Sequence, residues 1–162
     1  IKWEDLKVNV RVEILTNMSE WRGGYDAQTP TDWVSDHIES RVGCEIFYSM
    51  GQNPSGFACF TENNYVMVTL TADKRKVATN DHEKAELLNT IVSYAGKYRV
   101  EGNEWITSVQ VAWNPEWINT EQRRQFEIQK DQLRVLTSWR VMPNWADKGM
   151  QRSILTFSKA TN

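Results

Sequence analysis

Cysteine is scarce in this chain: Cys44 and Cys59 are the only two among 162 residues. Two thiols cannot build the disulfide framework on which many small secreted domains depend, and we interpret both as buried or half-buried thiols. The first six residues include Lys2, Glu4 and Asp5, and they lack the apolar core of a secretory signal. We therefore expect a cytoplasmic protein.

Neither sign of charge is in large excess. The chain has 19 Lys and Arg against 21 Asp and Glu, for a formal net charge of -2. Without a long basic run there is no stripe to follow a phosphate backbone, so we expect no nucleic-acid partner. No apolar stretch approaches the roughly 20 residues needed to cross a bilayer, so we expect no membrane partner either.

The usual signatures of cofactor and metal chemistry are also missing. The sequence has no glycine-rich nucleotide loop and no G-x-S-x-G elbow. His37 and His82 are far apart, and the cysteines lack C-x-x-C spacing. We predict no metal site and no cofactor, so any reaction would be cofactor-independent.

Tryptophan, by contrast, is abundant, with eight in the chain. Aromatic rings fill cores and also line ligand cavities, so this content raises the expectation of a ligand site without proving one. The length suits one domain, and we predict a single domain over residues 1–162.

Period-two alternation of apolar and polar residues predicts β-strands along most of the chain. The expected strands are 7–15, 33–41, 44–48, 57–61, 65–71, 97–100, 104–113, 123–129, 133–139 and 153–157. The polar turn at 62–64 predicts a hairpin. For 33–41, the pattern leaves open which face points inward.

One helix is predicted, at about 81–95. Asn80 can cap it with Glu83 three residues on, Leu87, Leu88, Ile91 and Val92 would form its apolar stripe, and Gly96 would end it. Eight or nine strands with a single helix and no β-α-β rhythm favour an all-β fold. We expect an antiparallel barrel that closes on itself and so removes its exposed edges.

Several motifs occur in an order that resembles the lipocalin-like domain family of small bacterial and fungal β-barrel proteins, from about Thr31 onward. The motifs are Trp33, YSMGQNPSGF at 48–57, NYVMVTL at 64–70, SYAGKYRV at 93–100, NPEWINTEQRRQF at 114–126 and the strand 133–137. The resemblance implies a calycin-type barrel, with residues 1–30 as an extension outside the match. It places Trp33 and Arg124 at the closed end as a structural plug, where a guanidinium can lie across an indole. The family often has histidine where this chain has Thr107 and Ser108, so no role of that histidine is carried over.

If Trp33 points inward, alternation sends Ser35, His37 and Glu39 inward as well. His37 is then the best acid–base candidate, because imidazole titrates near neutrality, with Glu39 or a tyrosine such as Tyr65 as its partner. The alternative is that His37 is a solvated histidine on the outer face.

Tyrosines and other aromatic residues in the predicted strands supply the expected ligand-binding wall. Phenols can hydrogen-bond a guest, and indoles can pack on it, but in a barrel the core and the pocket wall are the same surface. The predicted ligand-binding residues are Ser35, Tyr48, Met67, Tyr98, Trp105, Trp113, Phe126 and Trp139. Trp117 is a further cavity candidate.

The leading functional hypothesis is binding of a small hydrophobic or aromatic metabolite inside the barrel, with cofactor-independent isomerase, cyclase or lyase chemistry of secondary metabolism as an extension. One alternative is a binding or carrier protein without turnover. Another is an interaction domain whose barrel is packed solid. The alternating run in residues 1–30 could form an edge strand or a contact in a homodimer.

Overall fold

A computed structural model describes residues 6–9, 11–16, 45–130 and 132–158 of the chain. These residues form one 11-stranded antiparallel sheet. Its strands are β1 (Leu6–Asn9), β2 (Arg11–Thr16), β3 (Glu45–Phe47), β4 (Ser55–Phe60), β5 (Tyr65–Thr71), β6 (Ile91–Glu101), β7 (Glu104–Ala112), β8 (Glu121–Gln129), β9 (Gln132–Thr137), β10 (Arg140–Val141) and β11 (Met150–Ser158). The other elements are helix α2 (Asp81–Leu88) and the short 3-10 helices η1 (Pro115–Trp117) and η2 (Pro143–Lys148).

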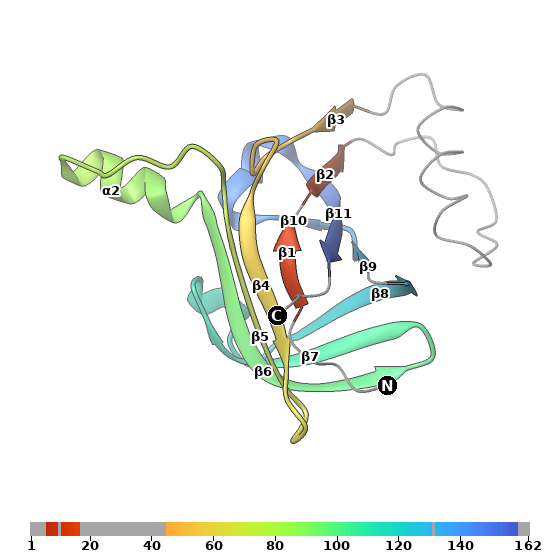
Figure 1. Cartoon of the computed structure of the whole chain (residues 1–162). Helices are drawn as coiled ribbons and strands as arrows, with labels where there is room; N and C mark the ends of the chain where they lie inside the picture. Colours follow the sequence, from red (N-terminus) through yellow and green to blue (C-terminus); the bar gives the residue numbers. More distant parts are fainter. Residues whose placement is uncertain (1–5, 10, 17–44, 131, 159–162) are drawn as a thin grey trace.

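The strands from β4 to β9 pair in chain order, each antiparallel to the next, and β9 then pairs with β11. This meander confirms the expected all-β, antiparallel class. The sheet curls around an interior, and α2 projects away from it (Figure 1).

The expected closed ring is not completed by hydrogen bonds. The paired strands run in the order β1-β4-β5-β6-β7-β8-β9-β11-β2-β3, and the two ends of this path do not pair with each other. The predicted strand 7–15 is two strands with different partners, because β1 pairs with β4 whereas β2 pairs with β11 and β3. The N-terminal chain therefore contributes to both ends of the sheet: β1 is the edge strand at one end, and at the other end β2 lies between β11 and the edge strand β3. The predicted strand 33–41 lies outside the described residues.

Alternation decides which side chains fill the interior. On β5, Val66, Val68 and Leu70 are buried, whereas Met67 and Thr69 between them are exposed. The same pattern places Leu133, Val135 and Thr137 of β9 on the inner face. Burial of the inner face of strands such as β5 and β9 stabilises the fold by about 25 cal/mol per Å² of apolar surface removed from water.

The hairpin predicted at 62–64 is confirmed. Residues Ser55 to Phe60 pair with Thr71 to Val66 in continuous register. Asn64 has φ 63, a left-handed conformation that asparagine adopts more readily than most residues. The hydroxyl of Thr61 accepts a hydrogen bond from the backbone N–H of Tyr65 at 3.0 Å and so holds the turn.

The predicted helix is shorter than expected, because it ends at Leu88. Its start is confirmed: the side chain of Asn80 accepts a hydrogen bond from the backbone N–H of Glu83 at 2.9 Å. Ile91 and Val92, expected on the helix, instead begin β6 and pair with Thr71 and Leu70. These two β-branched residues pack on the sheet, and none of the residues in α2 is buried.

Gly96 lies within β6 and marks a β-bulge rather than a helix end. The register shifts between Ala95 and Gly96, so that Ala95 opposes Val111 while Gly96 opposes Val109. A Cβ atom built on Gly96 would lie 1.9 Å from the backbone oxygen of Ser108, so glycine permits this close approach. The bulge reverses the alternation, and Val111 is therefore 66% exposed although Val109 is buried.

Candidate functional site

A cavity of about 40 Å³ lies between the inner faces of the strands. Most of its wall is apolar or aromatic. These apolar residues come from β5, β6, β7, β9 and β11, from the segment after β3, from η1, and from η2 with the residue before it. These wall residues are Met50, Val68, Leu70, Val92, Tyr94, Trp105, Trp117, Val135, Met142, Trp145, Leu155 and Phe157, and the polar ones are Arg124, Thr137, Arg140 and Ser153.

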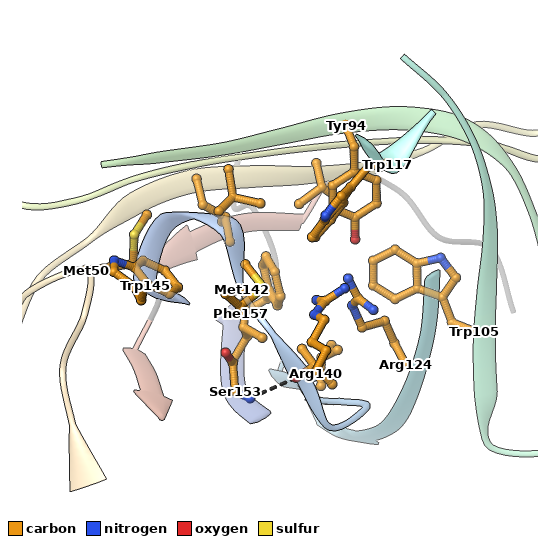
Figure 2. Close-up of a pocket in the computed structure, with 16 residues that line it drawn as sticks. Met50, Tyr94, Trp105, Trp117, Arg124, Arg140, Met142, Trp145, Ser153 and Phe157 are labelled. Carbon is orange, nitrogen blue, oxygen red and sulfur yellow. Dashed lines mark hydrogen bonds between the residues drawn. The ribbon is translucent and has the colours of Figure 1, made fainter. Parts of the chain in front are cut away.

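Two guanidinium groups lie next to each other in this wall (Figure 2). Arg124 comes from the middle of β8, where alternation turns Gln122 and Arg124 inward, and it is only 4% exposed. Arg140 comes from the short strand β10, which pairs with β11. Burial, with the like charge of Arg124 second, lowers the pKa of Arg140 to about 8. The cavity thus holds two cationic groups that repel each other.

The two arginines share one neutral acceptor. The side-chain oxygen of Gln122 accepts a hydrogen bond from Arg124 Nη2 at 3.3 Å and another from Arg140 Nη1. Arg124 also donates to the backbone oxygen of Arg123 at 3.0 Å. Arg140 Nε is buried without a hydrogen-bond partner, and none of the ion pairs among the described residues includes either arginine. Each guanidinium carries five N–H donors, and the described part of the chain accepts hydrogen bonds from only a few of them.

Aromatic rings provide most of the electrostatic compensation. The Arg140 guanidinium carbon lies 4.4 Å from the centre of the Trp117 ring, and that of Arg124 lies 5.9 Å from the same ring and 5.8 Å from Tyr94. Such cation–π contacts contribute roughly 0.5–2 kcal/mol each, with the larger values where water is excluded. They stabilise the cations without neutralising them.

At the far end of the cavity from Trp105, Met50 and Trp145 lie close together, with Met142 and Phe157 between them and the arginines (Figure 2). The segment η2, which carries Trp145, is held by two side chains rather than by strand pairing. Asn144 donates to the backbone oxygens of Asn89 and Ile91, both at 3.1 Å. Gln151 donates to the backbone oxygen of Trp145 at 3.1 Å.

Two of the predicted site residues line the cavity. Trp105 is 3% exposed, and its indole N–H donates to the Thr107 hydroxyl at 2.8 Å. Arg124 was expected as a plug across the indole of Trp33. Trp33 lies outside the described residues, and the rings found near Arg124 are those of Trp117 and Tyr94. Ser35, His37 and Glu39 also lie outside the described residues.

The other predicted residues do not line this cavity. Tyr65 and Met67 lie on the outer face of β5, because Val66 and Val68 occupy the inner one. Tyr48 follows β3, and its backbone oxygen accepts a hydrogen bond from Gly51 in a tight turn. Trp139 lies beyond the end of β9, so the alternation that would turn it inward has stopped, and the Arg152 guanidinium lies 5.4 Å from its ring.

Tyr98, Phe126 and Trp113 pack against the core but outside the cavity wall. Tyr98 meets Phe60 edge-on with ring centres 5.1 Å apart, and Phe60 meets Trp105 at 4.8 Å, which fills that part of the interior. Trp113 comes after the bulge and contacts Trp117 at 4.6 Å.

Sequence patterns do not indicate Arg140 as a site residue, because it lies between the expected strands 133–139 and 153–157. Met142 and Trp145 come from the same segment and were missed for the same reason. Tyr94 was missed because it was expected in the helix. Trp117 was a cavity candidate and does line the wall. The sequence contains only a weak signal for η2: three large apolar residues, Trp139, Met142 and Trp145, lie close together in an otherwise polar stretch.

A second, larger hollow of about 530 Å³ lies between the segment 73–79 and α2. Its walls are mostly exposed and charged, with Lys74, Arg75 and Lys76 facing a region that also includes Glu83 and Glu86. It has no buried polar group to orient a guest.

Two further observations concern the described residues alone. Within them, no group of three or more histidine, cysteine, aspartate or glutamate side chains could hold a metal ion. Their helix is also too short and too polar to cross a membrane.

A protein-family model described as a lipocalin-like domain matches residues 32–160, and no curated protein matches the chain. The start of the match agrees with the boundary expected near Thr31, and its extent covers every strand from β3 to β11. The meander, the inward aromatic residues and this match together establish that the chain belongs to the lipocalin-like domain family.

Proposed function

We propose that this protein binds a small, largely apolar or aromatic organic molecule in the interior of its sheet. Membership of the lipocalin-like family suggests small-molecule binding in general. The observation that carries the finer proposal is the cavity, whose wall combines aliphatic and aromatic side chains with a few polar groups that can orient a guest.

A guest of this kind requires the wall to move. The cavity of about 40 Å³ has room for a few water molecules, whereas sites for drug-sized ligands enclose roughly 300–1,000 Å³. Met50 and Met142 are suited to such movement, because methionine is unbranched and adopts many shapes at low cost. Trp145 lies in η2 outside the strand ladders, so it too can shift without breaking the sheet.

Intrinsic fluorescence tests the proposal directly, because Trp105, Trp117 and Trp145 all line the cavity. Titration with the neutral aromatic probe 2-naphthamide should change tryptophan emission in a saturable way. Val135→Phe, which places a larger side chain in the wall, should weaken this binding at least tenfold. Val111→Phe makes the same substitution on the outer face, where Val111 is 66% exposed, and should leave binding unchanged. Equal binding by both variants would place the guest elsewhere.

We extend the proposal to cofactor-independent isomerase, cyclase or lyase chemistry in secondary metabolism. What supports it is the acid–base capacity of His37 with Glu39, read from the sequence. Tyr65, on the outer face of β5, is not part of this extension. His37→Ala should abolish turnover of a substrate while leaving its binding intact, and unchanged turnover would favour the carrier alternative. Cytoplasmic location and a homodimer remain predictions, to be checked by cell fractionation and light scattering.

A further inference from the structure

Binding of an apolar molecule does not explain why two guanidinium groups lie side by side in the cavity wall. An apolar guest would be better held by apolar walls, since taking a charge out of water costs several kcal/mol unless it is compensated. Here Arg124 is 4% exposed and the Nε of Arg140 is buried and unpaired. Buried guanidinium groups of this kind would not stabilise a purely apolar guest.

The described surroundings do not neutralise either group. The acceptors that the described residues supply are the Gln122 side-chain oxygen and the Arg123 backbone oxygen, both uncharged. Acidic side chains do meet arginines on the outer face of the sheet, where Arg99 lies 2.7 Å from Glu121 and Arg123 lies 3.1 Å from Glu104. Among the residues that the structure describes, these acid–arginine pairs lie outside, and the two inner arginines have no acidic partner.

From this arrangement we infer that the cavity recognises the carboxylate of its guest, with Arg124 and Arg140 as the binding residues. The inference rests on the proposed function, because it specifies the class of molecule bound at the same site. A guanidinium presents a planar fork of N–H donors that matches the two oxygens of a carboxylate. The existing volume of about 40 Å³ suits a planar group of three atoms better than a tetrahedral phosphate.

The wall orients the rest of such a molecule. Trp105, Trp117 and Tyr94 lie at the same end of the cavity as the guanidinium groups, and Met142, Phe157, Met50 and Trp145 extend from them toward the other end (Figure 2). The anionic head would lie at the arginines with its apolar body directed toward the methionines and Trp145. The ligand class is therefore an apolar or aromatic monocarboxylic acid.

A pair of probes that differ in charge alone tests this inference. The wild-type protein should bind 2-naphthoate at least tenfold more tightly than its neutral analogue 2-naphthamide, measured by tryptophan emission at pH 7. Arg140→Met keeps most of the side-chain volume but removes the charge, and it should reduce this preference to about threefold or less. Arg134→Met, on the outward side of β9, is the matched control and should keep the full preference.

The outcomes separate the two proposals. Equal binding of both probes by the wild type would overturn the carboxylate inference while leaving the proposed function standing. Saturable binding of neither probe would overturn both. A preference for naphthoate that persists in Arg140→Met and in Arg124→Met would also overturn the inference, because the anion would then be bound elsewhere. Circular dichroism of each variant checks that the fold is retained.

Discussion

Gln122 is the residue on which the electrostatics of the interior depend. It is 8% exposed, and its side-chain oxygen accepts hydrogen bonds from both inner arginines while its nitrogen donates to the Thr120 hydroxyl at 3.1 Å. An amide can satisfy donors, but within the described residues it leaves two positive charges with no negative charge to neutralise them. This arrangement is complementary to one negative charge, which the proposed carboxylate guest would supply.

Gln122→Glu supplies that charge with almost no change of shape. The carboxylate would pair with both guanidinium groups, and hydrogen bonds to charged groups contribute about 1.5–3 kcal/mol. We expect a higher free energy of unfolding by about 1–3 kcal/mol in urea titrations at pH 7, together with at least tenfold weaker binding of 2-naphthoate. A variant that is less stable and binds the anion as before would contradict this account.

The lowered pKa of Arg140 predicts that the free energy of unfolding depends on pH. Burial and the Arg124 charge lower its pKa to about 8 in the folded protein, whereas an arginine in the unfolded chain keeps its ordinary, much higher pKa. The other titratable groups in the cavity wall are Arg124 and Tyr94. Above about pH 8 the unfolded state binds more protons than the folded state, so this group makes the free energy of unfolding rise with pH.

The measurement is the difference between wild type and Arg140→Met. Urea unfolding of both at pH 7, 8, 9 and 10 should show the wild type gaining stability relative to the variant as the pH rises above 8. Bound 2-naphthoate favours the protonated arginine, so its affinity for the wild type should fall over the same range. Parallel pH curves for the two proteins would refute the assignment to Arg140.

Elements can be predicted from the sequence where the local pattern and the tertiary structure agree. The β4–β5 hairpin could be predicted because a polar turn separates two alternating runs. The helix was extended too far because Ile91 and Val92 fit a helical stripe as well as a strand, and pairing with β5 decided the matter. The inward position of Arg140 could not be predicted from alternation, because a two-residue strand such as β10 is too short to show a period. The pairing of β10 with β11 decides which way the Arg140 side chain points.

The bulge in β6 explains the exposure of Val111 and gives a prediction for Gly96. The Cβ of an alanine there would lie 1.9 Å from the Ser108 backbone oxygen, so the two strands must separate. We expect Gly96→Ala to lower the free energy of unfolding by about 1–3 kcal/mol, as overpacking does. Lys97→Ala, an exposed change at the next position of β6, serves as the control in the same denaturation experiment. Similar stability of both variants would show that the bulge tolerates a side chain.

At the scale of the whole molecule, the sheet depends on its N-terminal chain. β1 covers the edge of β4, and β2 covers the edge of β11 and pairs on its other side with β3, so two consecutive short strands belong to opposite ends of the sheet. An uncovered strand edge presents unpaired N–H and C=O groups, which attract another chain. The change of pairing partner between β1 and β2 could not be predicted from the sequence. Alternation predicts a strand, but it does not show which neighbours the strand pairs with.

Removal of residues 1–9 should therefore change both stability and association. The deletion takes away β1 and leaves the edge of β4 open, so we expect a lower free energy of unfolding and dimers or larger species formed through β4. Size-exclusion chromatography with light scattering measures the association, and urea unfolding measures the stability. Removal of residues 1–4, which leaves β1 intact, is the matched control. If the longer deletion matched this control in both measurements, covering the β4 edge would not be what β1 contributes, and the open sheet would be stable by its interior packing alone.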